Sequence, residues 1–441
     1  MRYRFIIFCW VLLGCNLLSN AQLTVQQIGL LPEKVSNNAV CEGFINGRPY
    51  LFSFGGIDTS LNASGIHLKC FGYDILADSG FTLPDLPDTL GKIASAAHRI
   101  ENIIYVSGGY HVFSSGGEKS SSRLHRFDLN NLVFLPDAAD IPTPVDDHVQ
   151  AVWRDSLLFI ITGWSETANI PDVQIYNPTT NQWSTGTSVP NQHTYKSFGS
   201  SGTIIGDTIF YFGGASSGSG FPIQNQVRIG IINPQDATDI DWSFVVPDAA
   251  IVGYRMACTS VKNQPHWIGG SLNTYNYNGL AYDGSGASPV AKRDLFYNSA
   301  DSALNRIFAE EIPMDLRGLA SINDSVKYLA GGMGSDRKVT DKIMRITWSG
   351  LPVSKDETTP IPLEFSLFPN PAKERVHIGF STMPDATATV RITDAQGRIL
   401  LQSKTKKSYV TLDVHHLNAG YYTVIVSSIN GFAAKKLLIG Y

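Results

Sequence analysis

Six polar residues of this sequence share one place in a repeated pattern, and together they could recognise an acidic ligand. Each lies between 14 and 18 residues before the first glycine of a glycine-rich signal, just ahead of an expected strand. Four of the six carry a permanent positive charge, and arginine can bind a carboxylate or sulfate group through two parallel hydrogen bonds. The residues are Asn38, Lys92, His148, Lys196, Arg255 and Arg317.

Two interpretations of these residues stay open at this point. Either they form a cationic rim that faces a ligand, or they cap strand ends and pair with carboxylates close to them in the fold. The carboxylates available for such pairing are Asp58, Asp146, Asp147, Glu166 and Asp336.

A second candidate surface lies in the Tyr-, Asn- and Gly-rich segment 271–288. Tyr275, Tyr277 and Tyr282 could stack on sugar rings beside amide groups, although such segments are also ordinary surface insertions. Trp164 occupies the equivalent place in another repeat and would extend this platform. The sequence therefore predicts a ligand surface to which Tyr275, Tyr277 and Trp164 contribute.

Motifs for catalysis are scarce. The chain has no His-Glu-x-x-His metalloprotease motif and no phosphate-binding loop. The ten histidines follow no metal-ligand spacing, so a metal site would need residues far apart in the sequence to converge. We predict no catalytic residue, no metal and no cofactor, and a binding protein rather than an enzyme.

The glycine signals themselves define the elements that must position these residues. Apolar runs end in glycine six times, with the first glycines at positions 55, 108, 163, 213, 269 and 331, which are 50 to 62 residues apart. A run such as 208–212 carries apolar residues on both of its faces, as a strand buried on both faces should. A strand-bearing period of this length is typical of a β-propeller, so we expect six blades.

The repeat also resembles a known family. The hairpin, the glycine pair, and the later Tyr176-Asn177-Pro178 and Asn181-Gln182-Trp183 elements resemble the kelch repeat over about residues 23–350. The resemblance implies that residues approaching the first strand of each blade often face ligand. Galactose-oxidase-like enzymes share such blades but usually have seven, with a copper site that cannot be placed here. Sialic-acid mutarotases, which are exported and six-bladed, are the better enzyme analogy, with Glu166 or His148 beside Arg255 as an acid or base.

The two ends of the repeat region fit one closed ring. After the sixth glycine pair, 342–348 can form a third strand, but no fourth strand follows it. The segment 23–32 precedes the first blade and can supply that strand. We expect it to pair into blade six and to remove an exposed sheet edge.

The N-terminus reads as a secretory signal. Arg2 and Arg4 precede an apolar run that ends before the small residues 19–21, so we predict cleavage after Ala21. Lipoprotein processing at Cys15 is the alternative. No later segment is apolar enough to span a membrane.

After cleavage of the signal peptide, three cysteines remain: Cys41, Cys70 and Cys258. An odd and sparse set of this kind does not form a disulfide framework. Cys41 and Cys70 could pair or stay as buried thiols.

The C-terminal residues resemble a second family. Segment 351–362 reads as a linker, and 363–441 shows short alternating strands typical of a small immunoglobulin-like sandwich. Its motifs resemble the C-terminal sorting domain of the type IX secretion system, which implies the secretion machinery as a partner. The matching motif residues are Phe368, Pro369, Asn370, Pro371, Gly397, Gly420 and Tyr421.

These observations together predict an all-β protein. It comprises a signal peptide (1–21), a six-bladed kelch-type propeller (22–350), a linker (351–362) and a sorting domain (363–441). A net charge of −4 gives no electrostatic attraction to a phosphate backbone, so nucleic acid is not expected as a partner. We predict a secreted or cell-surface binding protein whose loop face recognises a glycan or a protein. The alternatives are a sugar-processing enzyme of mutarotase type and a structural or adhesive component.

Overall fold

The structure is a computed structural model that describes residues 22–299, 301–349, 365–380, 388–394, 399–407, 409–428 and 431–440. Within these ranges the chain forms β-strands and two short 3-10 helices, Ala63–Gly65 and Ser335–Arg337. None of the helices described there is long and apolar enough to cross a bilayer. The predicted signal peptide and linker lie outside the described residues.

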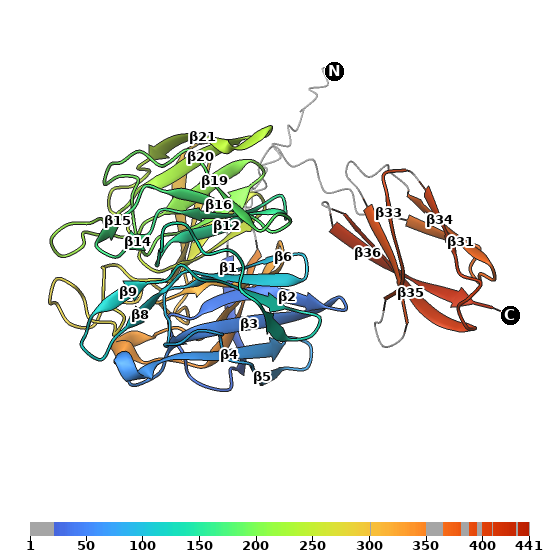
Figure 1. Ribbon diagram of the computed structural model, residues 1–441, viewed down its shortest axis with the longest axis horizontal. Helices are drawn as coiled ribbons and strands as arrows, with labels where there is room; N and C mark the ends of the chain where they lie inside the picture. Colours follow the sequence, from blue (N-terminus) through green and yellow to red (C-terminus); the bar gives the residue numbers. More distant parts are fainter. Residues whose placement is uncertain are drawn as a thin grey trace, which may run out of the picture.

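The described residues between 22 and 349 form six blade sheets arranged as a propeller (Figure 1). Five of these sheets have four antiparallel strands, and the first blade has four antiparallel strands with the short Arg317–Gly318 strand added in parallel at its inner edge. The first strands of neighbouring blades contact one another and line the axis, and between blades five and six the short Arg317–Gly318 strand makes the contact. These first strands are β2 (Ala39–Ile45), β6 (Ala96–Ile100), β12 (Val149–Trp153), β18 (Ser201–Ile205), β22 (Ala257–Val261) and β27 (Ala320–Asn323).

The second strand of each blade is the apolar run that ends at the glycine signal. These strands are β3 (Arg48–Ile57), β7 (Ile103–Ser107), β13 (Leu157–Ile161), β19 (Thr208–Phe212), β23 (Gln264–Ile268) and β28 (Val326–Ala330). They are buried almost throughout, because neighbouring blades cover both of their faces. This confirms the prediction from the glycine-punctuated runs.

The third and fourth strands form the outer part of each blade. The third strands are β4 (Ile66–Asp74), β10 (Leu124–Asp128), β16 (Val173–Asn177), β20 (Val227–Asn233), β24 (Arg293–Asn298) and β29 (Lys342–Ser349). The fourth strands are β5 (Ser79–Leu83), β11 (Val133–Leu135), β17 (Gln182–Thr185), β21 (Asp236–Val245), β25 (Ala303–Phe308) and β1 (Gln22–Leu30). Shorter strands lie in the connections: β8 (Tyr110–Val112), β9 (Glu118–Ser120), β14 (Trp164–Ser165), β15 (Ala168–Asn169) and β26 (Arg317–Gly318).

The N-terminal strand closes the ring. β1 pairs antiparallel with β29, from Gln22 opposite Ser349 to Leu30 opposite Lys342. The sixth sheet therefore has the order β1-β29-β28-β27 and joins the two ends of the repeat region. The predicted closure is confirmed.

The glycine pairs allow the blades to approach one another. Gly213 has a φ of +67°, and a Cβ built on it would lie 2.2 Å from the carbonyl oxygen of Gly253 in the connection to the next blade. The N–H of Gly214 donates to that same oxygen at 2.8 Å. Glycine is needed here because a side chain would meet backbone that cannot move aside.

The C-terminal segment is a sandwich of two antiparallel sheets, as predicted. One sheet contains β30 (Phe365–Phe368), β31 (Arg375–Phe380) and β34 (Tyr409–Asp413); the other contains β32 (Ala388–Thr393), β33 (Ile399–Thr405), β35 (Gly420–Ser428) and β36 (Gly431–Ile439). Alternate residues such as Val376, Ile378, Val390 and Ile392 are fully buried between the sheets.

Two other features of the sequence take definite places. Cys41 and Cys70 are buried free thiols on β2 and β4, in the apolar cluster between the first two blades, so they do not form a disulfide. Asn370 joins the Phe368–Pro371 motif to the last strand, because its amide donates to the Lys436 carbonyl at 2.9 Å and accepts from the Leu438 N–H at 2.8 Å.

Candidate functional site

One residue per blade turns toward the axis with a left-handed backbone, just before the first strand. Their φ angles lie between +46° and +67°. Side chains other than glycine, asparagine and aspartate rarely adopt this conformation, so the position is constrained by the ring rather than by local preference. The six residues are Asn37, Ala94, Asp147, Gly199, Arg255 and Asp315.

Hydrogen bonds link these six positions into a closed circle. The N–H groups of Asn37, Asp147, Gly199 and Arg255 donate to the carbonyl of the equivalent residue one blade earlier, at 2.7 to 3.2 Å. The N–H of Leu316 completes the step to Arg255 at 3.0 Å, and the N–H of Ala94 donates to the side chain of Asn37 at 3.0 Å. All six residues are buried, so they close the axis on this face, which we call the loop face.

An axial ion cluster, consisting of Asp147, Arg255, Asp315 and Arg317, fills the centre of this circle. Arg255 Nη2 lies 2.6 Å from Asp147 Oδ2, and Arg255 Nη1 lies 3.2 Å from Asp315 Oδ1. Arg317 Nη1 lies 3.5 Å from Asp147 Oδ1, and its Nη2 donates to the carbonyl of His148 at 2.8 Å. The two arginine charges therefore already face two carboxylates.

Burial sets the protonation of this cluster. Burial alone would lower the pKa of Arg255, but Asp147, Tyr254 and Asp315 together raise it well above its usual value, so the guanidinium is charged. Burial raises the pKa of Asp315, against the opposing effect of Arg255. Burial and the neighbouring Asp147 raise the pKa of Asp146 well above its usual range, so this carboxyl favours the neutral form.

The six polar residues taken from the sequence do not form one rim, and their contacts fit the second interpretation, in which such residues pair with other groups of the fold: Arg255 and Arg317 both face Asp147. Asn38 donates to Ser53 Oγ at 2.8 Å, and Lys92 pairs with Asp88 at 3.0 Å and with His125 at 2.7 Å. His148 contacts Ser107 at 2.8 Å, and Lys196 is half-buried. Arg255 is the one member of this set that lies in the axial circle, and Arg317 joins it in the axial ion cluster.

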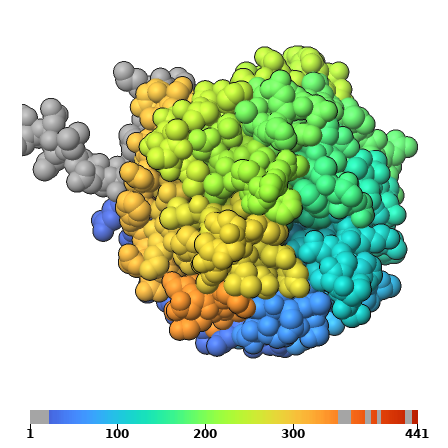
Figure 2. All heavy atoms as spheres, turned by 90° about the vertical axis from the view of Figure 1, so that its left-hand side faces the viewer, coloured from blue at the N-terminus to red at the C-terminus, as the bar shows by residue number. Residues whose placement is uncertain are grey.

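The segment Ser271–Ser288, which we call the blade-five loop, covers the axial ion cluster from outside. Figure 2 shows this loop in yellow near the centre of the loop face. Tyr275 is 0% exposed, its hydroxyl donates to Asp315 Oδ1 at 3.2 Å, and the Arg255 guanidinium lies 5.3 Å from its ring centre. Tyr275 is thus buried against the axial ion cluster and is not the exposed stacking surface that the sequence suggested. Tyr277 is half-buried.

Three aromatic side chains form a continuous, partly exposed strip on the same face, the loop-face patch: Trp164, Phe221 and Tyr282. The ring centres of Trp164 and Phe221 are 5.6 Å apart, and those of Phe221 and Tyr282 are 4.6 Å apart. Buried Phe198 supports the first two from below, at 5.4 Å from each. These residues come from blades three, four and five, so the ring architecture brings them together.

A channel runs along the axis beneath the ion cluster. It has a volume of about 290 Å³ and is lined by the first strands of the blades. Arg317 and His148 lie at the end closed by the ion cluster, whereas Glu42, Arg99 and Asp155 lie toward the other end of the strands. The channel therefore opens on the face opposite the loop face.

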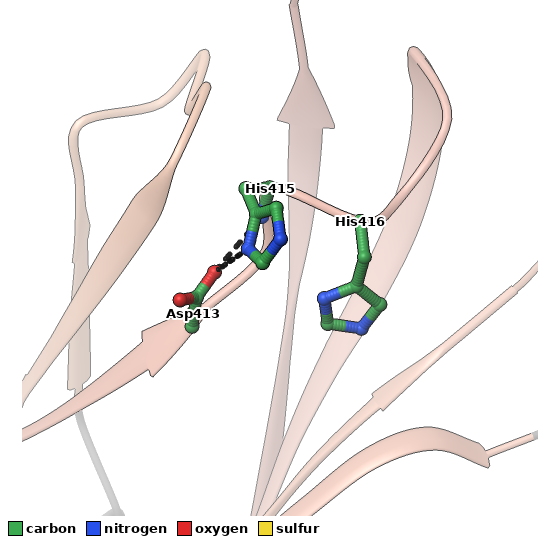
Figure 3. Close-up of side chains that lie close together, drawn as sticks. All are labelled: Asp413, His415 and His416. Atoms are coloured by element: carbon green, nitrogen blue, oxygen red, sulfur yellow. Dashed lines mark hydrogen bonds and ion pairs between the residues drawn. The ribbon is translucent and has the colours of Figure 1, made fainter.

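Two local patterns invite a catalytic or metal-binding interpretation. Gly214–Gly218 fits the Gly-x-Ser-x-Gly pattern of hydrolases, but it follows β19 in a loop between two strands, and Ser216 Oγ donates to the Pro222 carbonyl at 3.3 Å. Asp413, His415 and His416 offer ligand atoms within 4.8 Å of one another (Figure 3). All three are exposed, and Asp413 Oδ1 is already 2.5 Å from His415 Nδ1, so we assign no metal to them.

Two residues of this site escaped sequence analysis. Asp315 lies two positions before Arg317 and would have been found by aligning the residues that precede each first strand instead of counting back from the glycines. Phe221 lies in a serine- and glycine-rich loop that carries no periodic signal.

The predicted sorting motif is described in part. Gly397 lies outside the described residues, whereas Gly420 and Tyr421 begin β35. The Lys436 ammonium lies 3.6 Å from the ring centre of Tyr421.

Comparison with known proteins supports both parts of the chain. Residues 366–440 match the family model described as "Secretion system C-terminal sorting domain". Over 168 residues the chain is 27% identical to "Kelch-like protein 36" of Rattus norvegicus and 26% identical to that of Mus musculus. These matches cover 38% of this chain, which spans about a quarter of the length of each relative.

A solved structure extends the comparison to the whole ring. "Structure of YjhT" superposes with a TM-score of 0.57 at 14% identity, covering 73% of this chain and 99% of that chain. At this identity the likeness concerns the fold. The chain is therefore a kelch-type β-propeller followed by a type IX secretion C-terminal sorting domain, the latter indicating export to the cell surface or secretion.

Proposed function

We propose that this protein is an exported, non-catalytic binding protein that recognises a glycan through the loop-face patch. The observation that carries this proposal is the strip of three partly exposed aromatic rings on a face whose axis is closed. A closed axis leaves surface recognition as the mode of binding, and aromatic faces bind the C–H surfaces of sugar rings.

Polar groups beside the patch supply the directional contacts that a sugar needs. The blade-five loop carries Asn273, Asn276 and Asn278 as half-buried amides. Thr274 Oγ1 donates to the Phe221 carbonyl at 2.8 Å and thereby ties this loop to the patch. A ligand on the rings would therefore find amide donors and acceptors at their edge.

The enzyme alternative of mutarotase type fits the geometry less well. It would require solvent access to Arg255 and a nearby carboxylate, but Tyr275 covers both. Glu166 is exposed, and His148 lies on the channel side, while the hydrogen bonds of Arg255 go to Asp147 and Asp315. These placements favour binding over proton transfer.

We expect the full chain to retain specific glycans on a glycan array, and we expect the Trp164→Ala, Tyr282→Ala double variant to bind them at least about tenfold more weakly. Loss of two stacking surfaces accounts for a change of this size. Phe308→Ala is the matched control, because Phe308 is 67% exposed on an outer strand of the same ring. Absence of glycan binding by the wild type, or equal binding by the double variant, would contradict the proposal.

For export, we propose that residues 1–21 are a signal peptide and that 363–441 direct passage across the outer membrane. A chain ending at Pro362 is therefore expected to accumulate in the periplasm, whereas the full chain reaches the surface or medium. Cell fractionation followed by immunoblotting of both chains measures this. Normal export of the shortened chain would refute the role of the C-terminal domain.

A further inference from the structure

The larger sheet of the C-terminal sandwich has a broad outward face that carries positive charge. This sheet has the strand order β33-β32-β35-β36, and its residues Val390, Ile392, Val424 and Leu437 are fully buried in the core between the two sheets. Because successive side chains of a strand point to opposite faces, the residues next to these four point outward. The strand register therefore defines which side chains the outward face presents.

Three cationic side chains, Arg391, Lys404 and Lys436, lie on this face, on three of its four strands. Arg391 is opposite Gln402 on β33, and its Nε donates to the Gln402 side-chain oxygen at 2.9 Å. Lys404 follows Gln402 by two residues and so shares its face, and Lys436 directly precedes the inward Leu437. At about 4.8 Å between neighbouring strands, these charges are spread over about 15 Å of the sheet.

No carboxylate stands among these cations on the described part of the outward face. Glu374 and Asp413 belong to the smaller sheet and its connections, and Asp394 follows the end of β32. Lys406 and Lys407 are exposed directly after β33 and add two positive charges at one edge of the sheet. This face is therefore net positive, in a chain whose formal charge is −4 overall.

Exposed aromatic and aliphatic side chains accompany the charges. Tyr421 points outward, because its neighbour Tyr422 packs against the core. Tyr421 is 60% exposed, and the Lys436 ammonium lies over its ring within the range of a cation–π contact. Ile399 and Leu400, at the start of β33, are 48% and 38% exposed. Tyrosine beside cations and aliphatic side chains is typical of surfaces that meet a membrane, where the phenol ring lies at the level of the headgroups.

We propose that this face, which we call the cationic sheet face (Arg391, Lys404, Lys436 and Tyr421), docks on a lipid surface that carries anionic phosphate headgroups. Its ammonium and guanidinium groups pair with the phosphates, and the exposed Tyr421 and Leu400 contact the boundary between headgroups and acyl chains. A lipid surface fits better than a soluble polyanion, which would leave these apolar side chains in water. Export to the cell surface or secretion, which the match to the sorting-domain family indicates, also carries this domain past membranes.

Cosedimentation of the full chain with lipid vesicles tests the proposal. We expect binding to vesicles of equal parts phosphatidylglycerol and phosphatidylcholine, and no binding to phosphatidylcholine alone. Raising the salt from about 0.1 M to about 1 M should release the protein, because the screening length falls from about 10 Å to about 3 Å. Each cation removed should weaken binding about fivefold, so the Arg391→Gln, Lys404→Gln, Lys436→Gln triple variant should bind roughly 100-fold more weakly.

Two further variants separate the cationic sheet face from overall charge and from folding. The Lys404→Arg, Lys436→Arg variant keeps both charges and should bind within about twofold of the wild type. The Lys34→Gln, Lys119→Gln, Lys338→Gln variant removes three exposed cations of the propeller, which changes the net charge as much as the triple variant does. It should bind the anionic vesicles as the wild type does.

Several results would overturn the proposal. They are no binding of the wild type to anionic vesicles, equal binding to neutral vesicles, equal binding by the triple variant, or an equal loss in the propeller variant. Retention of the chain by polyglutamate instead of the vesicles would identify an acidic polypeptide as the partner and would also overturn it. None of these variants alters the loop-face patch, so the test is independent of the glycan recognition proposed above.

Discussion

Replacing Asp147 by alanine is expected to lower the free energy of unfolding by about 3 to 5 kcal/mol, the range typical of breaking a buried ion pair from one side. Asp147 accepts from Arg255 through both carboxylate oxygens, at 3.1 and 2.6 Å, and also faces Arg317. Removing it leaves Arg255 with Asp315 and takes away the carboxylate that Arg317 faces. The loss is therefore much larger than for a surface ion pair.

Chemical denaturation of the full chain measures this change. Asp147 has a φ of +46°, so part of the effect of alanine is backbone strain. Asp147→Asn tolerates that conformation and removes only the charge, so comparing the two variants separates the two causes. Asp241→Ala, at an exposed position, is the control and should change stability by less than about 0.5 kcal/mol. A loss below about 1 kcal/mol for both Asp147 variants would show that the ion cluster is dispensable.

The second large expected effect is a loss of folding stability at low pH. Burial lowers the pKa of His98 to about 4, and burial reinforced by Arg317 lowers that of His148 to about 3, from an ordinary value of 6.5. Below pH 6.5 the unfolded chain therefore binds more protons than the folded one, so stability falls as the pH drops toward 4. At about 1.4 kcal/mol per pKa unit, each histidine contributes on the order of 3 kcal/mol to this loss.

Denaturation midpoints measured between pH 4 and pH 7.5 test this expectation. The His98→Asn and His148→Asn variants should each flatten the profile, because an amide does not titrate there. His193→Asn, at an exposed site, should leave the slope unchanged. Identical slopes for all four proteins would show that the two channel histidines do not carry the pH dependence.

The ring was predictable because its signals are local and repeated. The apolar runs, the glycine pairs and the missing last strand can each be recognised within a short segment of sequence. Each of the six blades also needs the same kind of buried second strand, so the signal is repeated six times. The pairing of β1 with β29 followed from counting strands. The sandwich followed in the same way from alternation along short strands.

The site could not be predicted to the same extent, because its geometry depends on residues from several blades. Counting back from glycine placed Lys92 and Arg317 in one register, but Lys92 pairs with Asp88 whereas Arg317 lines the axial channel. Tyr275 looked like a surface tyrosine, yet its loop folds inward onto Asp315. The sequence did not show that the charged residues are buried. The cost of burying them is offset by ion pairs that join residues from different blades, which lie far apart in the sequence.

The register of the closing strand shows that this ring has no structurally privileged starting point. Gln22 and Ser349 are direct cross-strand partners at the end of the β1–β29 ladder, so a turn of a few residues would bridge them. A circularly permuted gene could therefore start in the segment between β1 and β2 and carry residues 22–30 after 349 without breaking a single ladder hydrogen bond. Such a rearranged chain would build the sixth blade entirely from consecutive hairpins.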